Sequence, residues 1–182
     1  MQRREGWAIW VTGLPGCGKT AISRKVKELL NERGIDVKIL ELDEIRRFVT
    51  PNPTYSDEER DIVYAALAYM AKLLVECGMP VIIDATAHRR KYRERARTLI
   101  SRFAEVYVKC PLAVCMQRER QRHAEHSPSR IYEKAQRGAR VPGVGVPYEE
   151  PLDPEVVVES DKLSVAESAR KIVEFIFSTF ER

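Results

Sequence analysis

This chain of 182 residues has no long uncharged stretch, no cysteine framework and no histidine cluster. Its longest uncharged run covers residues 6–18, which is shorter than the roughly 18 residues of a membrane-spanning helix and is broken by glycine and proline. The four cysteines, at positions 17, 77, 110 and 115, have neither metal-ligand nor disulfide-framework spacing, and the three histidines have no metal spacing. The first residues also lack the apolar stretch of a signal peptide. These absences exclude a helical membrane protein and a secreted disulfide scaffold, and we expect a protein of the reducing cytoplasm.

Repeats and low-complexity tracts are also missing, and the composition is typical of one soluble globular domain over residues 1–182. Hydrophobic residues make up 44% of the chain and charged residues 32%, with a formal net charge of +4. Arginine accounts for 21 of the 31 basic residues. Because arginine suits bidentate binding of phosphate and carboxylate, the composition leaves two kinds of partner open, a nucleic acid and a small anion.

Short apolar runs alternate with helical stretches along the chain. Strands are predicted over residues 7–12, 37–42, 81–84, 103–109 and 156–158. Helices are predicted over residues 21–33, 56–76, 89–102, 111–119 and 164–180. Ser56 with Glu59, and Ser164 with Glu167, predict capping boxes at two of the helix starts. This alternation predicts an α/β fold in which a parallel sheet of five strands is covered by helices on both faces.

A phosphate-binding loop follows the first predicted strand. Residues 13–20 match the P-loop pattern G-x-x-x-x-G-K-[ST] between a strand and a helix. Glycine at these positions allows successive N–H groups to converge on phosphate oxygens. Lys19 is predicted to bridge the terminal phosphates as a catalytic residue, and the Thr20 hydroxyl is predicted to hold Mg²⁺ through ATP. Cys17 is interpreted as a small filler and not as a nucleophile. The residues expected to bind ATP here are Gly13, Leu14, Pro15, Gly16, Cys17, Gly18, Lys19 and Thr20.

One long segment, residues 121–154, has no clear periodicity. Loops of this length are usually functional or disordered. Its basic residues and glycines, in a chain with a phosphate-binding loop, favour a lid over roughly residues 119–150.

Acidic residues follow two of the predicted strands. In open parallel sheets, ligands bind beyond the carboxyl ends of the strands, where Glu41, Asp43 and Asp84 fall. Each of Asp43 and Asp84 could orient an attacking hydroxyl, hold Mg²⁺ through water, or simply cap the next helix. Arg46 follows Asp43 by one helical turn and could hold an anionic substrate beside it, which favours a functional Asp43. For Asp84 the two interpretations stay open.

Two further features also have a functional and a plain structural interpretation. Tyr55 could stack on a base and Arg60 could bind an anion, or they could form a hydrophobic staple and a solvated side chain. The stretch Arg89–Arg97 contains six basic residues in nine. It could contact phosphate or RNA, or form an ordinary solvated helix face.

Together these residues resemble the adenylylsulfate (APS) kinase family. The resemblance is carried by the P-loop, by Glu41 and Asp43 followed by Arg46, and by the segments over residues 55–60, 103–118 and 132–155. It extends from about Trp7 to Val158. It implies a P-loop kinase fold with strand order 2-3-1-4-5, and transfer of the γ-phosphoryl group of ATP to the 3′-hydroxyl of adenosine 5′-phosphosulfate, giving PAPS and ADP. It also implies a homodimer.

The resemblance also implies roles for individual residues. Asp43 would orient or deprotonate the acceptor hydroxyl, Arg46 and Arg60 would hold the phosphosulfate, and Tyr55 would pack on the adenine. On the nucleotide side, Arg118 and the lid would close over ATP and exclude water. The acceptor-binding residues expected from the resemblance are Asp43, Arg46, Tyr55, Arg60 and Lys134.

The chain departs from the family pattern at several positions around the acceptor. Glu41 replaces the usual aspartate, and residues 85–88 contain no serine equivalent to the one discussed in the family as a phosphorylated intermediate. Val63 stands where the family usually has asparagine. The stretch from Arg118 to Tyr132 is longer than in the family, and the loop before Pro147 is shorter and lacks an aromatic residue for the second face of the adenine.

These departures keep two alternatives open. The first is a P-loop kinase that acts on an RNA, tRNA-linked or other small-molecule hydroxyl, with residues 89–97 as a phosphate track, although the +4 charge makes nucleic acid a poorer fit. The second is a non-catalytic nucleotide-binding switch, which the acids at the edge of the sheet disfavour.

Overall fold

The computed structural model describes residues 5–121 and 130–182. Its strands are β1 (Ala8–Thr12), β2 (Lys38–Glu41), β3 (Val81–Asp84), β4 (Phe103–Lys109) and β5 (Val156–Glu159). Its helices are α1 (Lys19–Asn31), α2 (Leu42–Val49), α3 (Asp57–Glu76), α4 (Arg90–Leu99), α5 (Leu112–Gln121), α6 (Ile131–Gln136) and α7 (Val165–Thr179). Within the described ranges, no helix is long and apolar enough to cross a membrane.

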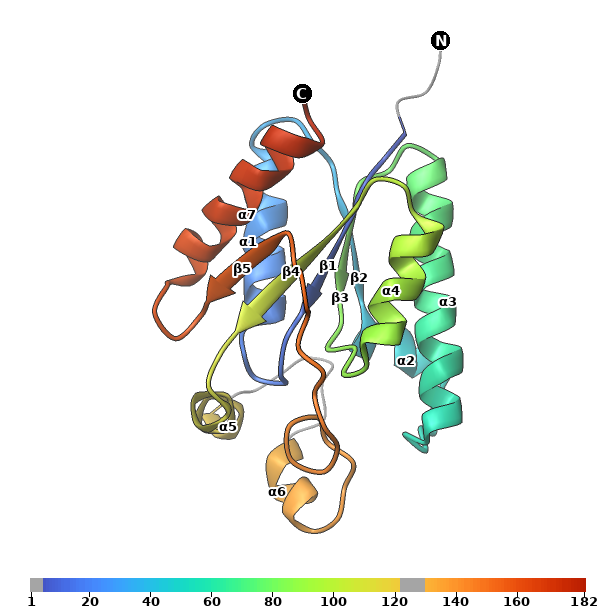
Figure 1. Ribbon diagram of the computed structural model, residues 1–182, viewed down its shortest axis with the longest axis vertical. Coiled ribbons are helices and arrows are strands. Elements are labelled where there is room, and N and C mark those ends of the chain that lie inside the picture. Colours follow the sequence, from blue (N-terminus) through green and yellow to red (C-terminus); the bar gives the residue numbers. More distant parts are fainter. Residues whose placement is uncertain (1–4, 122–129) are drawn as a thin grey trace.

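The strands form one five-stranded sheet in the order β2-β3-β1-β4-β5, and every neighbouring pair is parallel (Figure 1). This confirms the predicted fold class and strand order. β1 lies in the centre and all five of its residues are buried, as its nearly continuous apolar sequence predicts.

Helices cover both faces of the sheet (Figure 1). Successive side chains of a strand point to opposite faces, and β1 separates the two cores accordingly. Ile9 and Val11 pack in the core shared with α1 and α7, whereas Ala8 and Trp10 pack in the core shared with α3 and α4. Both layers are thus anchored on the strand that leads into the P-loop.

The carboxyl ends of the strands all point to one edge of the sheet, and α5 and α6 lie beyond that edge (Figure 1). Two helices at this edge, α2 and α6, were not predicted from the sequence. β2 ends at Glu41, and Asp43 lies in the first turn of α2, a short helix that was not predicted. Asp43 and Glu44 complement the positive end of this helix, and Arg46 and Arg47 complement its negative end. α6 lies inside the predicted lid, of which residues 122–129 fall outside the described residues.

Candidate active site

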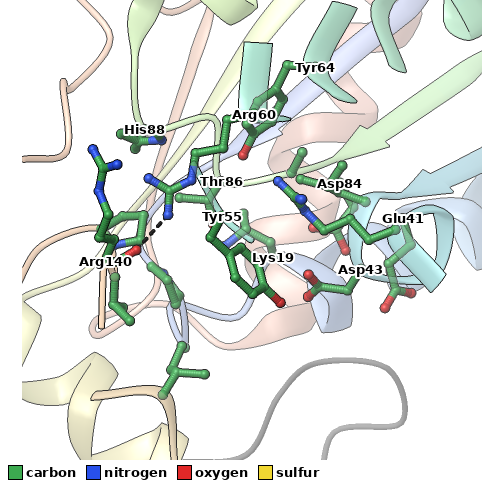
Figure 2. A pocket seen from close by; sticks show the side chains of 18 of the residues that line it. Lys19, Glu41, Asp43, Tyr55, Arg60, Tyr64, Asp84, Thr86, His88 and Arg140 are labelled. Atoms are coloured by element: carbon green, nitrogen blue, oxygen red, sulfur yellow. Dashed lines mark hydrogen bonds between the residues drawn. The ribbon is translucent and has the colours of Figure 1, made fainter. Parts of the chain in front are cut away.

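A cavity of about 410 Å³ lies at the carboxyl ends of β2 and β3, next to the P-loop (Figure 2). Its walls come from the P-loop, α2, the start of α3, the residues after β3, α6 and the segment 139–142. Predicted site residues that line it are Pro15, Gly16, Lys19, Thr20, Asp43, Arg46, Tyr55, Arg60 and Lys134. Residues separated by more than a hundred positions therefore meet around one space.

The P-loop needs glycine for two physical reasons. A Cβ on Gly13 would lie 2.5 Å from the carbonyl oxygen of Val108, and one on Gly16 would lie 2.5 Å from that of Cys115. Gly16 also has φ +81°, a conformation that other residues rarely adopt. The loop runs directly into α1, which begins at Lys19, and the N–H groups at the start of a helix are suited to bind an anion.

Lys19 and Thr20 of the loop line the cavity, and Cys17 does not. Lys19 donates from Nζ to the carbonyl oxygens of Gly13 and Leu14, each over 3.1 Å. Cys17 is fully buried, and burial raises the pKa of its thiol. A neutral, enclosed thiol is a packing group, which agrees with its interpretation as a filler.

Asp84 ends β3 on the floor of the cavity, with Val11 and Glu41 as its register neighbours on the two adjacent strands. Burial raises the pKa of its carboxyl to about 6, although Lys19 and a hydrogen bond with Thr20 oppose this rise. Its Oδ2 atom is buried and has no hydrogen-bond partner in the part of the chain that the structure describes. The sequence placed Asp84 at this edge, but only the structure shows that it faces the P-loop.

The side chain of Arg46 is held between an acid and an aromatic ring. Its Nη1 lies 3.0 Å from Oε1 of Glu59, and its guanidinium lies 5.2 Å from the centre of the Tyr55 ring. The second oxygen of Glu59 accepts hydrogen bonds from the backbone N–H and the hydroxyl of Thr54, at 2.6 and 2.7 Å. Glu59 also accepts the backbone N–H of Tyr55 over 3.3 Å, so it positions two predicted substrate-binding residues, Arg46 and Tyr55. Sequence reasoning did not predict this role of Glu59.

The capping box predicted at the start of α3 forms only one of its two hydrogen bonds. Oγ of Ser56 accepts the N–H of Glu59 over 3.1 Å, as expected. The carboxylate of Glu59 does not return to Ser56, because Thr54, Tyr55 and Arg46 occupy it. By contrast, both halves of the predicted box between Ser164 and Glu167 are present at the start of α7.

The opposite side of the cavity is cationic (Figure 2). Arg60 is buried and donates from Nη2 to the carbonyl oxygen of Arg140 over 2.6 Å, and its Nη1 is buried without a partner among the described residues. Burial and the nearby Arg140 lower the pKa of Arg60. His88 lies beside them, and burial, followed by the charges of Arg60 and Arg89, lowers its pKa to about 4. Neither His88 nor Arg140 was predicted as a site residue.

Figure 2 shows how the charges are divided around this space. Glu41, Asp43 and Asp84 lie on one side, His88 and Arg140 lie on the other, and Lys19 projects between them. The cavity can thus accept a ligand with an anionic end toward Arg60 and Arg140 and a reactive group toward Asp43 and the P-loop. Among residues 5–121 and 130–182, no group of three or more His, Cys, Asp or Glu side chains could hold a metal ion by itself.

Lys134 and Arg118, two predicted binding residues in or beside the lid, make different contacts. Lys134 on α6 lines the cavity, and α6 is tied to the P-loop because the hydroxyl of Tyr132 donates to the carbonyl oxygen of Pro15 over 2.6 Å. Arg118 instead donates from Nη2 to the carbonyl oxygen of Ser160 over 2.7 Å, and its Nη1 lies 3.3 Å from the hydroxyl of the same residue. A contact between Arg118 and ATP stays a prediction.

The basic run on α4 is largely used inside the protein. Arg93 is 1% exposed and pairs with Glu105 while donating to the carbonyl oxygens of Ala87 and Glu149. Arg97 makes a two-point contact with Glu155, at 2.5 and 2.8 Å. Further pairs of this run join Arg89 to Asp57 and Lys91 to Asp61. The run is neither a plain solvated face nor an open phosphate track, so the RNA alternative loses its main support.

Known proteins resemble this chain over nearly its whole length. It matches the model of the adenylylsulphate kinase family over residues 5–159. An adenylyl-sulfate kinase from Halothermothrix orenii is 34% identical over 97% of this chain and 92% of its own length. A probable adenylyl-sulfate kinase from Pyrococcus abyssi is 39% identical over 93% of this chain and 94% of its own length.

The fold gives the same result. The structure of the APS kinase CysC from Mycobacterium tuberculosis, in complex with AMPPNP and APS, has a TM-score of 0.84 to this chain at 28% identity. The match covers 94% of this chain and 98% of the other. Family model, relatives and fold agree with the P-loop, the acids and the arginines around the cavity. This chain is therefore a member of the adenylylsulphate kinase family of P-loop proteins.

Proposed function

We propose that this protein is an ATP-dependent adenylyl-sulfate kinase, which transfers the γ-phosphoryl group of ATP to the 3′-hydroxyl of adenosine 5′-phosphosulfate and forms PAPS and ADP. The observation that carries this proposal is one cavity that joins the P-loop lysine, a carboxylate and a cationic wall. The family membership and the names of the relatives support the choice of acceptor.

On the nucleotide side, the N–H groups of the P-loop and of the start of α1 would bind the phosphates, and Lys19 would offset charge on the transferred group. Thr20 would hold Mg²⁺ with its hydroxyl, a hard oxygen ligand of the kind this ion prefers. When bound, Mg²⁺ neutralises and orients the terminal phosphates. Residues 119–150 would form a lid, with Arg118 on the nucleotide side, that excludes water as a competing acceptor.

On the acceptor side, Asp43 would orient or deprotonate the 3′-hydroxyl, since it lines the cavity with Lys19. Arg60 offers the buried Nη1 that has no partner within the described residues, and it would bind the phosphosulfate with Arg46 and Lys134. Tyr55 would pack on the adenine from the same wall. Most of the protein's contribution is then positioning, because phosphoryl transfer through a loose transition state needs little covalent chemistry from side chains.

A competition assay tests the choice of acceptor. ADP release would be measured with ATP and Mg²⁺ in the presence of APS, adenosine, gluconate or tRNA. We expect stimulation by APS well above that by the other three. Stimulation by tRNA or gluconate and none by APS would replace the proposed function, and ATP binding with no acceptor-dependent release would favour a nucleotide-binding switch.

The proposal includes the homodimer implied by the family resemblance. Light scattering during gel filtration gives the mass directly. A mass of two chains would support this part of the proposal, and a mass of one chain would contradict it without affecting the activity.

A further inference from the structure

We infer that Tyr132 is a positioning residue, which sets the place of Lys134 in the acceptor part of the cavity by fixing α6 to the P-loop. This inference rests on the proposed function, in which Lys134 helps to bind the phosphosulfate. The segment that carries the family resemblance includes Tyr132, but the resemblance implies no role for this residue.

α6 is too short to hold its position by itself. It has six residues, which is about half the length that an isolated helix needs to be even marginally stable in water. Its N-cap residue, Arg130, has φ +52° and offers no side-chain hydrogen bond to the start of the helix. The place of α6 is therefore set by its contacts with the rest of the protein.

Two hydrogen bonds attach α6 to its surroundings. The hydroxyl of Tyr132 donates to the carbonyl oxygen of Pro15 over 2.6 Å, and the side chain of Tyr132 is 2% exposed, within the core shared with α1 and α7. The backbone N–H of Ile131 donates to Oε1 of Glu119 on α5 over 3.0 Å. The first of these bonds joins the helix directly to a residue of the P-loop.

The side chains of α6 divide between a buried face and a cavity face. Tyr132 and Ala135, three positions apart, are both buried. Ile131 and Lys134, also three positions apart, both line the cavity. Because side chains three positions apart lie on the same side of a helix, each pair marks one face. Whatever fixes the buried face therefore also fixes where Lys134 stands in the cavity.

The P-loop side of this contact is closely packed. A Cβ on Gly16 would lie 2.5 Å from the carbonyl oxygen of Cys115, so α5 lies directly against this glycine. Pro15, the residue before it, accepts the hydrogen bond from α6 and has a backbone φ restricted by its ring. Lys134 is thus positioned relative to the loop that would bind ATP. Phosphoryl transfer needs donor and acceptor in a fixed mutual position, and this connection provides one.

The kinetics of Tyr132→Phe test the inference, because this change removes the hydroxyl and keeps the ring in the core. KM for APS and kcat would be measured for wild type, Tyr132→Phe, Lys134→Ala and the double variant. If the competition assay identifies another acceptor, KM for that acceptor takes its place. One hydrogen bond contributes about 2- to 10-fold, so we expect KM to rise by this factor in Tyr132→Phe while kcat changes by less than about twofold. In the Lys134→Ala background the same change should raise KM by less than about twofold, because the side chain that was positioned is gone.

Tyr148→Phe is the matched control. It also removes a tyrosine hydroxyl that contacts a residue next to the P-loop, since Oη of Tyr148 lies 2.9 Å from Oγ1 of Thr12, but Tyr148 does not belong to α6. Its effect on KM should be the same with and without Lys134.

The outcomes separate this inference from the proposed function. An unchanged KM in Tyr132→Phe, or a rise by the same factor with and without Lys134, would overturn the inference and leave the proposed function standing. An equal dependence on Lys134 in Tyr148→Phe would overturn it too, because it would indicate a general loosening of the lid. A normal KM in Lys134→Ala would contradict both the inference and the proposed role of Lys134.

A second variant covers the case in which Tyr132→Phe does not fold. Glu119→Gln weakens the other hydrogen bond of α6, because an amide oxygen replaces the carboxylate oxygen that accepts the N–H of Ile131. We expect a rise in KM of about two- to fivefold that is again absent in the Lys134→Ala background. No rise, or a rise of the same size in both backgrounds, would show that the position of α6 does not act through Lys134 and would contradict the inference.

Discussion

The side chain of Arg60 donates to the backbone carbonyl oxygen of Arg140 over 2.6 Å and so joins α3 to the predicted lid. The side chain of Arg140 completes the connection, because its Nη2 lies 3.0 Å from Oδ1 of Asp57 at the start of α3. These contacts keep residues 139–142 against the cavity. The cationic wall of the active site and the connection to the lid segment are thus built from the same arginines.

Asp57→Asn should weaken acceptor binding. This residue pairs with Arg140 and with Arg89, and the hydrogen bond from Arg140 lowers the pKa of its carboxyl. Because all three side chains are partly exposed, we expect a KM for APS about two- to fivefold higher at low salt, with little change in kcat. The difference from wild type should shrink at high ionic strength, where exposed charges are screened. Asp61→Asn is the control, since Asp61 lies on the same helix and pairs with Lys91. An equal rise in KM for both variants would contradict a role for the lid contact.

Glu59→Gln should affect acceptor binding more strongly, because Glu59 pairs with Arg46 where both side chains are mostly buried, and it also holds the exposed Thr54. A hydrogen bond to a charged group contributes more than a neutral one, and we expect KM for APS to rise roughly tenfold while the affinity for ATP stays the same. Glu59→Asp, which keeps the charge, should recover part of the loss. If the affinity for ATP fell as much as that for APS, Glu59 would be a general structural residue.

The lowered pKa of His88 predicts that the stability of the folded protein depends on pH. Burial lowers its pKa in the folded protein from 6.5 to about 4. Between these two values the unfolded chain binds a proton at this position and the folded protein does not, so stability falls as the pH drops through this range. We expect His88→Asn to reduce the fall in the free energy of unfolding between pH 7.5 and pH 4 by about 3 kcal/mol or less.

Urea titrations of wild type and His88→Asn at both pH values measure this difference directly. Comparing the two proteins removes the contribution of the other titrating groups. The same acid destabilisation in both proteins would show that His88 does not remain neutral in the folded state.

Arg93→Ala tests the conclusion that the basic run of α4 is structural. Arg93 is buried with Glu105, and removing one partner of a buried ion pair costs about 3 to 5 kcal/mol of stability. Arg95→Ala, whose side chain donates to the carbonyl oxygen of Asp61 from a partly exposed position, should cost much less. Thermal unfolding of both variants provides the comparison. Equal stability in both, with loss of tRNA binding, would restore the RNA alternative.

Much of the fold follows from local sequence patterns. The buried strands are continuous apolar runs, and the P-loop has a strict spacing, so both were predictable from the chain alone. α2 was not predicted because Leu40, Glu41 and Leu42 continue the alternation of apolar and polar residues in β2. The chain instead turns helical at Leu42, where charged residues make up the first turn. Only one of the two hydrogen bonds of the capping box predicted at the start of α3 is present, because Thr54 and Arg46 bind the carboxylate of Glu59.

The parts of the site that sequence could not predict depend on contacts between distant residues. His88 and Arg140 are 52 positions apart, and both line the cavity beside Arg60, which bonds to the backbone of Arg140 within the lid. The two interpretations of residues 89–97 could not be separated by spacing, because the acids that pair with them lie on α3, on β4 and near β5. Asp84 was ambiguous for the same reason, since the cavity that it lines is formed with residues of the P-loop, α2 and α6 that lie far from it in the sequence.

We propose above that this protein phosphorylates the 3′-hydroxyl of APS in this cavity, with Asp43 as the residue that acts on that hydroxyl. The most direct measurement is product analysis, by mass spectrometry and ³¹P NMR, of wild type and Asp43→Ala with ATP, Mg²⁺ and APS. We expect wild type to form ADP and one product with a new 3′-phosphate, and Asp43→Ala to form it about 10²- to 10⁴-fold more slowly while binding ATP as well as wild type does. Phosphate on another group, no product from APS, or near-normal turnover in Asp43→Ala would contradict the account.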